Sequence, residues 1–208
     1  MFNQTTSLPT DRGFYDADTG NLLSLADLRR QSTFVSEGLT LLHAISPHQT
    51  VAIVARNCIT YPLALLSASR IGAAVTCLPN EAQPDDLAYY FKASNTVFVF
   101  ADATTVDRVK QACESVGIRG DKVVRLDDGA GDREAMTIGD LAAEGKQMEV
   151  EGQSVVPWTP EKPADQICGF LNFSSGTTGR PKAVCGSLLK DRLRLANTST
   201  RFEYHIPT

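Results

Sequence analysis

The sequence predicts an α/β protein with a largely parallel sheet whose strands are joined by helical crossovers. Three observations favour this class. Short apolar, β-branched runs recur, stretches with helical spacing of apolar residues lie between them, and Gly or Pro stands near the junctions. With 208 residues, 42% of them hydrophobic, the chain can bury a sizeable core, and disorder over most of its length is excluded.

The first elements set the pattern that the rest of the chain repeats. Residues 1–20 show no clear period, and we expect them to form an extended lead-in. Residues 22–43 carry apolar side chains at helical intervals and predict one or two amphipathic helices. The run VAIVA at 51–55 is typical of a strand buried on both faces. The apolar stretch at 59–71 predicts a helix that stops at Gly72.

Strand and helix then continue to alternate, as parallel strands with crossover helices require. Pro84 opens one helix, and Asp85 and Asp86 in its first turn favour the positive end of the helix dipole. The predicted segments up to residue 126 are a strand at 74–78, a helix from Pro84, a strand at 97–101, a helix at 104–116 and a strand at 122–126. They are followed by a short helix at 137–147, strands at 168–173 and 182–185, and a helical tail at 188–195.

Charge and cysteine usage exclude several functions. The net charge of −4 leaves no basic surplus for a nucleic-acid backbone, so we expect no nucleic-acid partner. The first residues lack the pattern of a signal peptide, and the longest apolar stretch is interrupted by Arg70 and is too short to cross a membrane. Five cysteines without a C-x-x-C pair disfavour a metal site and a disulfide framework. They indicate reduced, mostly buried thiols in a cytoplasmic protein.

The most informative stretch is SSGTTGRPK at 174–182. Gly176 and Gly179 let the backbone bend so that successive N–H groups can point into one concavity. Four serine and threonine hydroxyls surround that bend, and Lys182 brings an ammonium group just past it. Such a loop is suited to grip a di- or triphosphate.

Two other interpretations of this loop are disfavoured. It is not the common G-x-x-x-x-G-K-[ST] loop, because Lys182 lies three positions after Gly179 and the segment beyond it has the character of a strand. Clusters of Ser, Thr and Gly are usually ordinary surface turns. The full nine-residue string between two apolar strands favours a phosphate grip in a strand–loop–strand setting.

The segment NFSSGTTGRPKAV resembles the phosphate-loop signature of the adenylate-forming enzymes, which include acyl-CoA synthetases, coumarate-CoA-ligase-like enzymes, luciferases and peptide-synthetase adenylation domains. Phe173 stands at the family's aromatic position, and Ala183 replaces its usual Gly. Residues 52–80 and 84–102 are similar, more weakly, to the family's first strand–helix–strand unit and to the helix and strand that follow it.

The resemblance implies an ATP-dependent acid–thiol ligase. In this family a carboxylate attacks the α-phosphate of Mg²⁺-ATP to give an acyl-adenylate and pyrophosphate, and a thiol of coenzyme A or of a carrier-protein pantetheine then takes the acyl group. Arg180 falls at the family's variable position, and its side chain is expected to face solvent. The residues to which the resemblance assigns the triphosphate are Ser174, Ser175, Gly176, Thr177, Thr178, Gly179 and Lys182.

The same resemblance implies that residues 1–208 form a single partial AMP-binding domain, the first part of the large N-terminal domain of such an enzyme. Within it we expect the lead-in at 1–20, an α/β subdomain at 21–148, a proline-rich connection at 149–165, and the strand–loop–strand unit with the start of a helix at 166–208.

Two positions depart from the family's pattern, and both concern the handling of substrate. The usual Asn-Pro after the second strand is inverted to Pro79-Asn80. Leu188 stands near the place where the family often carries a histidine.

The family's adenine, ribose, acyl and magnesium motifs and its catalytic lysine lie downstream of the loop and are not found in residues 188–208, so we name no catalytic and no metal-binding residue. The parent chain is expected to be an enzyme and this chain by itself to be inactive, either as a piece of a longer ligase or as a short protein with another purpose. The alternative function is a non-catalytic nucleotide-binding or protein-interaction module. A third hypothesis is an unrelated α/β enzyme whose loop matches the family's signature by chance. Unpaired sheet edges predict self-association or a partner subunit.

Other candidate residues have ordinary structural explanations. His43, His48 and His205 lack carboxylate or cysteine neighbours at ligand spacing and are expected to be packed or surface residues. Cys185 is expected to be a buried strand residue. The consecutive aromatic residues at 89–91 should face different directions on their helix.

Overall fold

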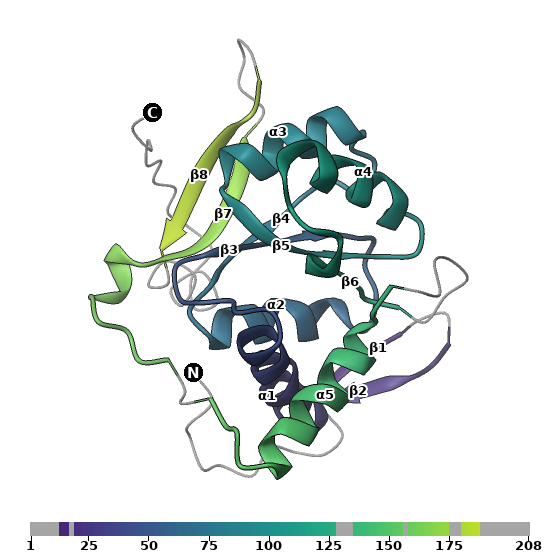
Figure 1. Cartoon of the computed structure of the whole chain (residues 1–208), viewed down its shortest axis with the longest axis vertical. Coiled ribbons are helices and arrows are strands. Elements are labelled where there is room, and N and C mark those ends of the chain that lie inside the picture. The colour runs from purple at the N-terminus through teal and green to yellow at the C-terminus, as the bar shows by residue number, and fades with distance from the viewer. Residues whose placement is uncertain (1–12, 17–18, 128–134, 156–157, 175–179, 188–208) are drawn as a thin grey trace.

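A computed structural model describes residues 13–16, 19–127, 135–155, 158–174 and 180–187. They form an α/β unit with helices on both faces of one sheet (Figure 1), as predicted. Among the described residues the sheet has six strands in the order β6-β5-β3-β4-β7-β8, of which the first five run parallel and β8 runs antiparallel to β7. The strands are β3 (Thr50–Val54), β4 (Ala74–Cys77), β5 (Thr96–Ala101), β6 (Val123–Arg125), β7 (Cys168–Ser174) and β8 (Lys182–Ser187).

In the part of the chain that the structure describes, five helices cover the two faces of the sheet (Figure 1). Helices α1, α2 and α5 pack together on one face, and α3 and α4 pack together on the other. Their bounds are α1 (Leu25–Leu41), α2 (Tyr61–Arg70), α3 (Pro84–Ala93), α4 (Val106–Val116) and α5 (Ile138–Val150).

Strand β3 shows why the sheet needs helices on both sides. All five of its residues are buried. Val51 and Ile53 belong to the apolar cluster shared with α1, α2 and α5, whereas Ala52 and Val54 belong to the cluster shared with α3 and α4. Successive side chains of a strand point to opposite faces, so a strand that is apolar throughout must be covered twice. The prediction of a doubly buried strand is confirmed.

Side-chain caps fix where two of the helices begin. The Ser24 hydroxyl accepts a hydrogen bond of 3.0 Å from the Asp27 N–H at the start of α1. At the start of α5, Thr137 and Asp140 form a reciprocal capping box, with hydrogen bonds of 3.1 and 2.9 Å. Each cap satisfies backbone N–H groups that the first helical turn leaves without a partner.

Helices α1 and α5 approach each other at glycines. A Cβ atom added at Gly145 would lie 1.9 Å from the backbone oxygen of Phe34, and one at Gly38 would lie 2.8 Å from that of Leu141.

The side chain of Glu37, only 4% exposed, lies in α1. Burial, and then the charge of Glu149, raise the pKa of its carboxyl group, although Arg70 opposes the shift.

The beginning of the chain differs from the sequence prediction. Residues 13–15 form strand β1 (Gly13–Tyr15), which pairs antiparallel with β2 (Leu22–Ser24) in a separate two-stranded sheet. The lead-in therefore contains a strand that its irregular pattern did not reveal. Leu22, expected in a helix, belongs to β2 because the cap at Ser24 makes Leu25 the first helical residue.

Smaller corrections concern boundaries and thiols. Helix α5 ends at Val150, just inside the predicted connection, and α2 begins at Tyr61 rather than at Ile59. The five cysteines carry thiols, as expected, but only Cys113 is buried, so the prediction of mostly buried thiols is wrong. The predicted helical tail at 188–195 lies outside the described residues.

None of the helices in the described part of the chain has the length and apolar character needed to cross a membrane.

Candidate functional site

The candidate site lies where β7 ends and β8 begins. The antiparallel register pairs Ser174 with Lys182, so the first and last residues of the SSGTTGRPK segment face each other across the two strands. This confirms the predicted strand–loop–strand setting. The other predicted site residues, Ser175, Gly176, Thr177, Thr178 and Gly179, lie outside the described residues.

The topology places this hairpin at an edge of the sheet that commonly binds ligands. Strand β7 runs parallel to β4, with Val75 opposite Phe170. The β7 residue Ser174 is therefore at the carboxyl end of its strand, on the same side of the sheet as the carboxyl ends of the other parallel strands. In open α/β sheets this is the edge outside which ligands usually bind.

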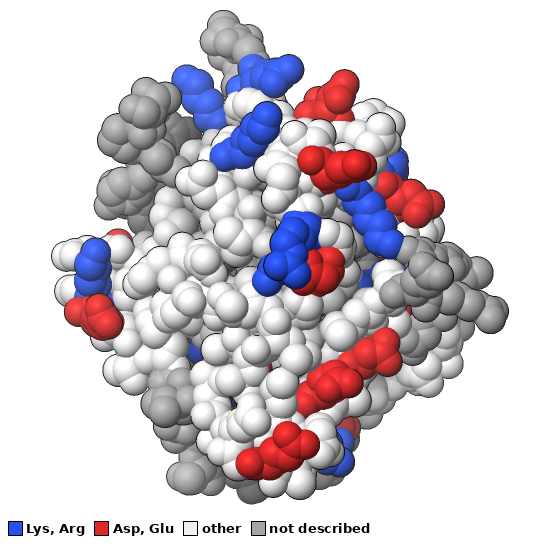
Figure 2. Space-filling view, in the orientation of Figure 1, with Lys and Arg blue, Asp and Glu red and all other residues white. Residues whose placement is uncertain are grey.

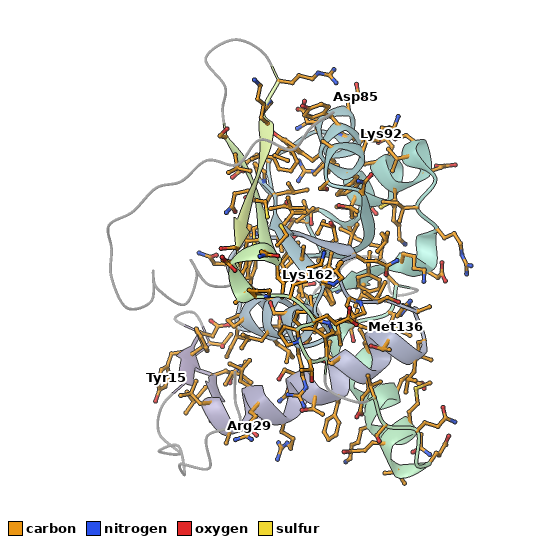
Figure 3. All side chains as sticks on the ribbon, turned by 90° about the vertical axis from the view of Figure 1, so that its left-hand side faces the viewer. Tyr15, Arg29, Asp85, Lys92, Met136 and Lys162 are labelled. Atoms are coloured by element: carbon orange, nitrogen blue, oxygen red, sulfur yellow. The ribbon has the colours of Figure 1, made fainter. Side chains whose placement is uncertain are left out.

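The residues that frame the loop are accessible and carry positive charge. Ser174, Arg180 and Lys182 are all exposed. Figure 2 shows Lys and Arg side chains gathered at the end of the molecule where β8 and α3 lie. Figure 3 shows Asp85 and Lys92 of α3 at this end, and Tyr15 far from it. An exposed guanidinium and an ammonium at the two sides of a proline suit the binding of a polyphosphate.

Helix α3 contacts both sides of the hairpin. The Tyr90 ring packs on Phe173 of β7, with 4.6 Å between ring centroids. The Tyr89 hydroxyl donates a hydrogen bond of 2.8 Å to the carbonyl oxygen of Pro181. The guanidinium carbon of Arg180 lies 4.9 Å from the centroid of the Tyr89 ring.

Sequence reasoning missed these contacts. It expected the three aromatic residues at 89–91 to face different directions, which the structure confirms, since Phe91 is buried in the core while the two tyrosines reach the hairpin. It also expected Arg180 to face solvent. That side chain is exposed, but it lies over an aromatic ring. Tyr89 and Pro181 are 92 positions apart, so no local pattern could have joined them.

A second place where ligands could bind, between the carboxyl ends of β3 and β5, is occupied by the protein's own groups. The chain switches direction across the sheet here, which is the usual position of a ligand crevice. The Asp102 carboxylate accepts hydrogen bonds from the N–H groups of Arg56 and Thr104, both at 2.8 Å, and from that of Thr105 at 3.0 Å. The Thr105 hydroxyl in turn donates to the carbonyl oxygen of Val54.

These hydrogen bonds determine the charge state of Asp102. Burial alone would raise the pKa of its carboxyl group, but the hydrogen bonds from Thr104, Arg56 and Thr105 together hold it below its usual value. The carboxylate is therefore ionised and engaged at neutral pH. This arrangement locks the loop after β3 to the start of α4.

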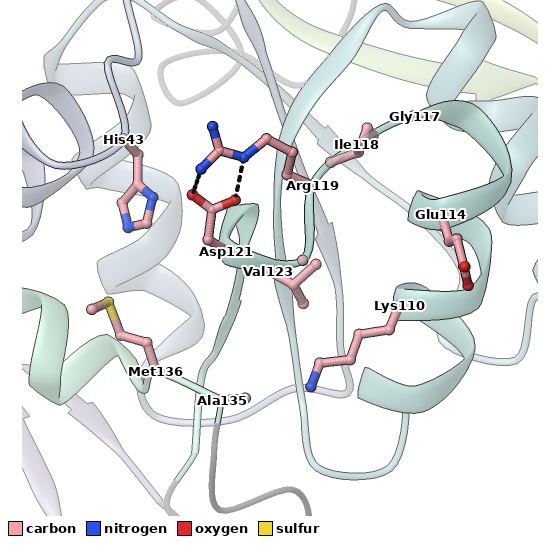
Figure 4. Close-up of a pocket in the computed structure, with 11 residues that line it drawn as sticks. His43, Lys110, Glu114, Gly117, Ile118, Arg119, Asp121, Val123, Ala135 and Met136 are labelled. Carbon is pink, nitrogen blue, oxygen red and sulfur yellow. Dashed lines mark hydrogen bonds and ion pairs between the residues drawn. The ribbon is translucent and has the colours of Figure 1, made fainter.

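A cavity of about 830 Å³ lies at the opposite edge of the sheet, beside β6 (Figure 4). His43, which lines it, is buried, and its ring packs edge-on against Phe98 at 5.0 Å. Burial, and then the charge of Lys122, lower the pKa of His43, so its imidazole is neutral near pH 7. The prediction of a packed histidine is confirmed here. His48 is a surface residue, also as expected, and His205 lies outside the described residues.

Cys185 lies on strand β8, as predicted, but it is partly exposed rather than buried.

The sheet order, its helical layers and the strand–loop–strand hairpin define the fold of the adenylate-forming enzymes. A red-emitting luciferase from Phrixothrix hirtus superposes with a TM-score of 0.77 at 19% identity, covering 92% of this chain and 35% of the luciferase. A benzoate CoA ligase from Burkholderia xenovorans LB400 gives 0.69 at 18% identity, covering 89% of this chain and 33% of the ligase.

The chain belongs to the AMP-binding enzyme family, which it matches over residues 2–200. It is 27% identical over 187 residues to 4-coumarate–CoA ligase 1 of Arabidopsis thaliana, covering 88% of this chain and 32% of the ligase. It is 31% identical over 169 residues to 4-coumarate–CoA ligase 5 of Oryza sativa, covering 81% and 28%. The chain thus spans about a third of the length of these relatives.

Proposed function

We propose that this chain is the triphosphate-binding part of an ATP-dependent acid–thiol ligase. In the first step a carboxylate oxygen of the substrate bonds to the α-phosphorus of ATP, and the bond from that phosphorus to the bridging oxygen of pyrophosphate breaks. In the second step a thiol sulfur attacks the acyl carbon, loses its proton to a base, and releases AMP. Mg²⁺ enters as part of the nucleotide substrate.

The role proposed for residues 174–182 is to hold the β- and γ-phosphates. Negative charge grows on the departing pyrophosphate in the first step, and backbone N–H groups, hydroxyls and the Lys182 ammonium would stabilise that charge. The observation that carries the proposal is the pairing of Ser174 with Lys182 at the carboxyl edge of the sheet. Membership of the AMP-binding family supports the same role.

The acyl substrate is proposed as a carboxylic acid, and the acceptor as coenzyme A or a pantetheine thiol. The matched relatives named as 4-coumarate–CoA and acyl-CoA ligases support both classes. A cytoplasmic location is also proposed, and the five cysteine thiols support it.

Binding of Mg²⁺-ATP and of inorganic tripolyphosphate to the 208-residue chain, measured by titration calorimetry, tests the phosphate site. We expect Lys182→Ala and Thr178→Ala to weaken both ligands about tenfold, since each removes a hydrogen bond to a charged group. Lys162→Ala, which removes an exposed lysine of the connection before β7, is the matched control. Equal binding by all four proteins, or no binding by the wild-type chain, would contradict the proposal.

Release of pyrophosphate that depends on both ATP and a carboxylic acid separates a ligase from a nucleotide-binding module. The second candidate function for the chain by itself is a nucleotide-binding module. Such release would exclude the module, whereas ATP binding without it is expected both of a module and of an isolated part of a ligase. Association through β6 or β8, the outer strands of the sheet in the described part of the chain, remains a prediction, and a monomeric mass at high concentration would contradict it.

A further inference from the structure

Two consecutive residues of α3 hold the two sides of the phosphate-loop hairpin. Tyr90 contacts β7 through the ring of Phe173, and both residues pack against the core cluster beneath α3 and α4. Tyr89 contacts the residues that lead into β8, through its hydroxyl at Pro181 and its ring at Arg180. Both sides of the hairpin therefore contact the same helix.

The contact at Pro181 falls where the strand pairing begins. The ladder between β7 and β8 starts with the pair Ser174 and Lys182, directly after Pro181. In the described part of the chain β8 pairs with β7 alone and forms an edge of the sheet. The end of an edge strand opens more easily than a central strand, because fewer contacts must be broken. The Tyr89 hydrogen bond is a tertiary contact at that end.

The stacked guanidinium adds a second contact to the same ring. Arg180 lies within the distance at which a cation is attracted to the face of an aromatic ring. Its side chain is exposed, so the contact orients the charge without removing it from solvent. Tyr89 thus restrains both the backbone at Pro181 and the cation beside it.

We propose that Tyr89 is a positioning residue for the phosphate loop. By holding Pro181 and Arg180 against α3, it keeps Lys182 opposite Ser174 and brings the two ends of the loop together before a nucleotide arrives. A site whose geometry is set in advance loses less conformational entropy on binding, and so it binds more tightly. This inference rests on the proposed phosphate-binding function.

The test compares Tyr89→Phe with Tyr90→Phe. The first variant removes the hydroxyl that reaches Pro181, and the second removes a hydroxyl from the next residue while leaving its ring on Phe173. We expect Tyr89→Phe to weaken tripolyphosphate and ATP binding about fivefold, which corresponds to one ordinary hydrogen bond. We expect the control to remain within about twofold of the wild type, since the Tyr90 hydroxyl makes no hydrogen bond within the described part of the chain.

Hydrogen exchange of the β8 amides, measured without ligand, gives a readout independent of nucleotide binding. Tyr89→Phe should speed exchange at residues 182–187, and Tyr90→Phe should not. Arg180→Met should weaken tripolyphosphate binding, and Arg180→Lys should restore most of it, because a cation is again available to the ring. If Tyr89 served overall stability alone, Tyr89→Phe would lower the melting temperature. Its affinity for tripolyphosphate would then be unchanged at temperatures well below that melting temperature.

The outcomes separate this inference from the proposed function. If the wild-type chain binds no tripolyphosphate, the proposed function fails. Unchanged β8 exchange in Tyr89→Phe would then overturn the positioning role as well, whereas faster exchange would support it. If the wild type binds and Tyr89→Phe binds equally well, the positioning role is overturned whatever the exchange shows.

Discussion

The close approach of α1 and α5 at Gly145 makes a sharp prediction about stability. Gly145→Ala adds a Cβ atom 1.9 Å from the backbone oxygen of Phe34. Since nonbonded carbon and oxygen atoms need a separation above about 3 Å, the helices must move apart by roughly 1 Å. The atom that is met belongs to the backbone, so no rotation of a side chain relieves the contact.

The magnitude follows from what that movement separates. Leu39 and Leu141, both fully buried, lie in the core cluster to which α1 and α5 contribute. A gap of this size loses a quarter to a half of each contact's attraction. Overpacking of this kind costs about 1–3 kcal/mol. Because the added Cβ atom meets a backbone atom, we expect a cost near the upper end of this range. The higher helix propensity of alanine offsets about 1 kcal/mol. We expect a net loss of about 2 kcal/mol.

The assay is thermal unfolding followed by circular dichroism, with Gly139→Ala as the matched control on the same helix. A Cβ atom at Gly139 would come no closer than 3.5 Å to its nearest neighbour, the Thr137 hydroxyl. A loss of about 2 kcal/mol should lower the melting temperature by roughly 6 °C in a chain of this size. The control should be unchanged or slightly stabilised. If Gly145→Ala melts at or above Gly139→Ala, the packing argument is refuted.

Three further predictions concern groups elsewhere in the fold. Asp102→Asn should lower the free energy of unfolding by about 2–4 kcal/mol at pH 7, because an amide cannot accept all of the carboxylate's hydrogen bonds. Since the pKa of Asp102 is depressed in the folded state, urea titrations should show this stability present above about pH 4 and lost as the pH falls. Glu37→Gln should stabilise the protein at pH 7 but not at pH 4. The pKa of Glu37 is raised in the folded state, so the stability of the wild type falls as the pH rises above the ordinary pKa of a glutamate. Glu144→Gln, at an exposed position, should show no such difference. Gly72→Ala should destabilise by about 2 kcal/mol or more, since this glycine has a φ of +76° and its added Cβ would lie 2.5 Å from the Trp158 ring; equal urea midpoints for Gly72→Ala and wild type would contradict this.

Much of the fold could be predicted because its signals are local. The apolar run at 51–55 and Pro84 at the start of α3 each report on a few neighbouring residues. The SSGTTGRPK string is also local, and its two flanking strands lie where the sequence predicted them. By contrast, strand β1 has only three residues, too few for a period to appear, and it forms because β2 is there to pair with it.

The sequence by itself determined the alternation of strands and helices and the loop with its cation, because helical period, strand period and turn chemistry act over a few residues. The tertiary structure alone decided which distant groups meet. Tyr89 reaches Pro181, Asp102 receives the N–H of Arg56, and Gly145 allows α5 to touch α1. The physical reason is that each of these contacts depends on the order and spacing of the strands in the sheet, which bring together residues far apart in the chain and leave no trace in the pattern around either one.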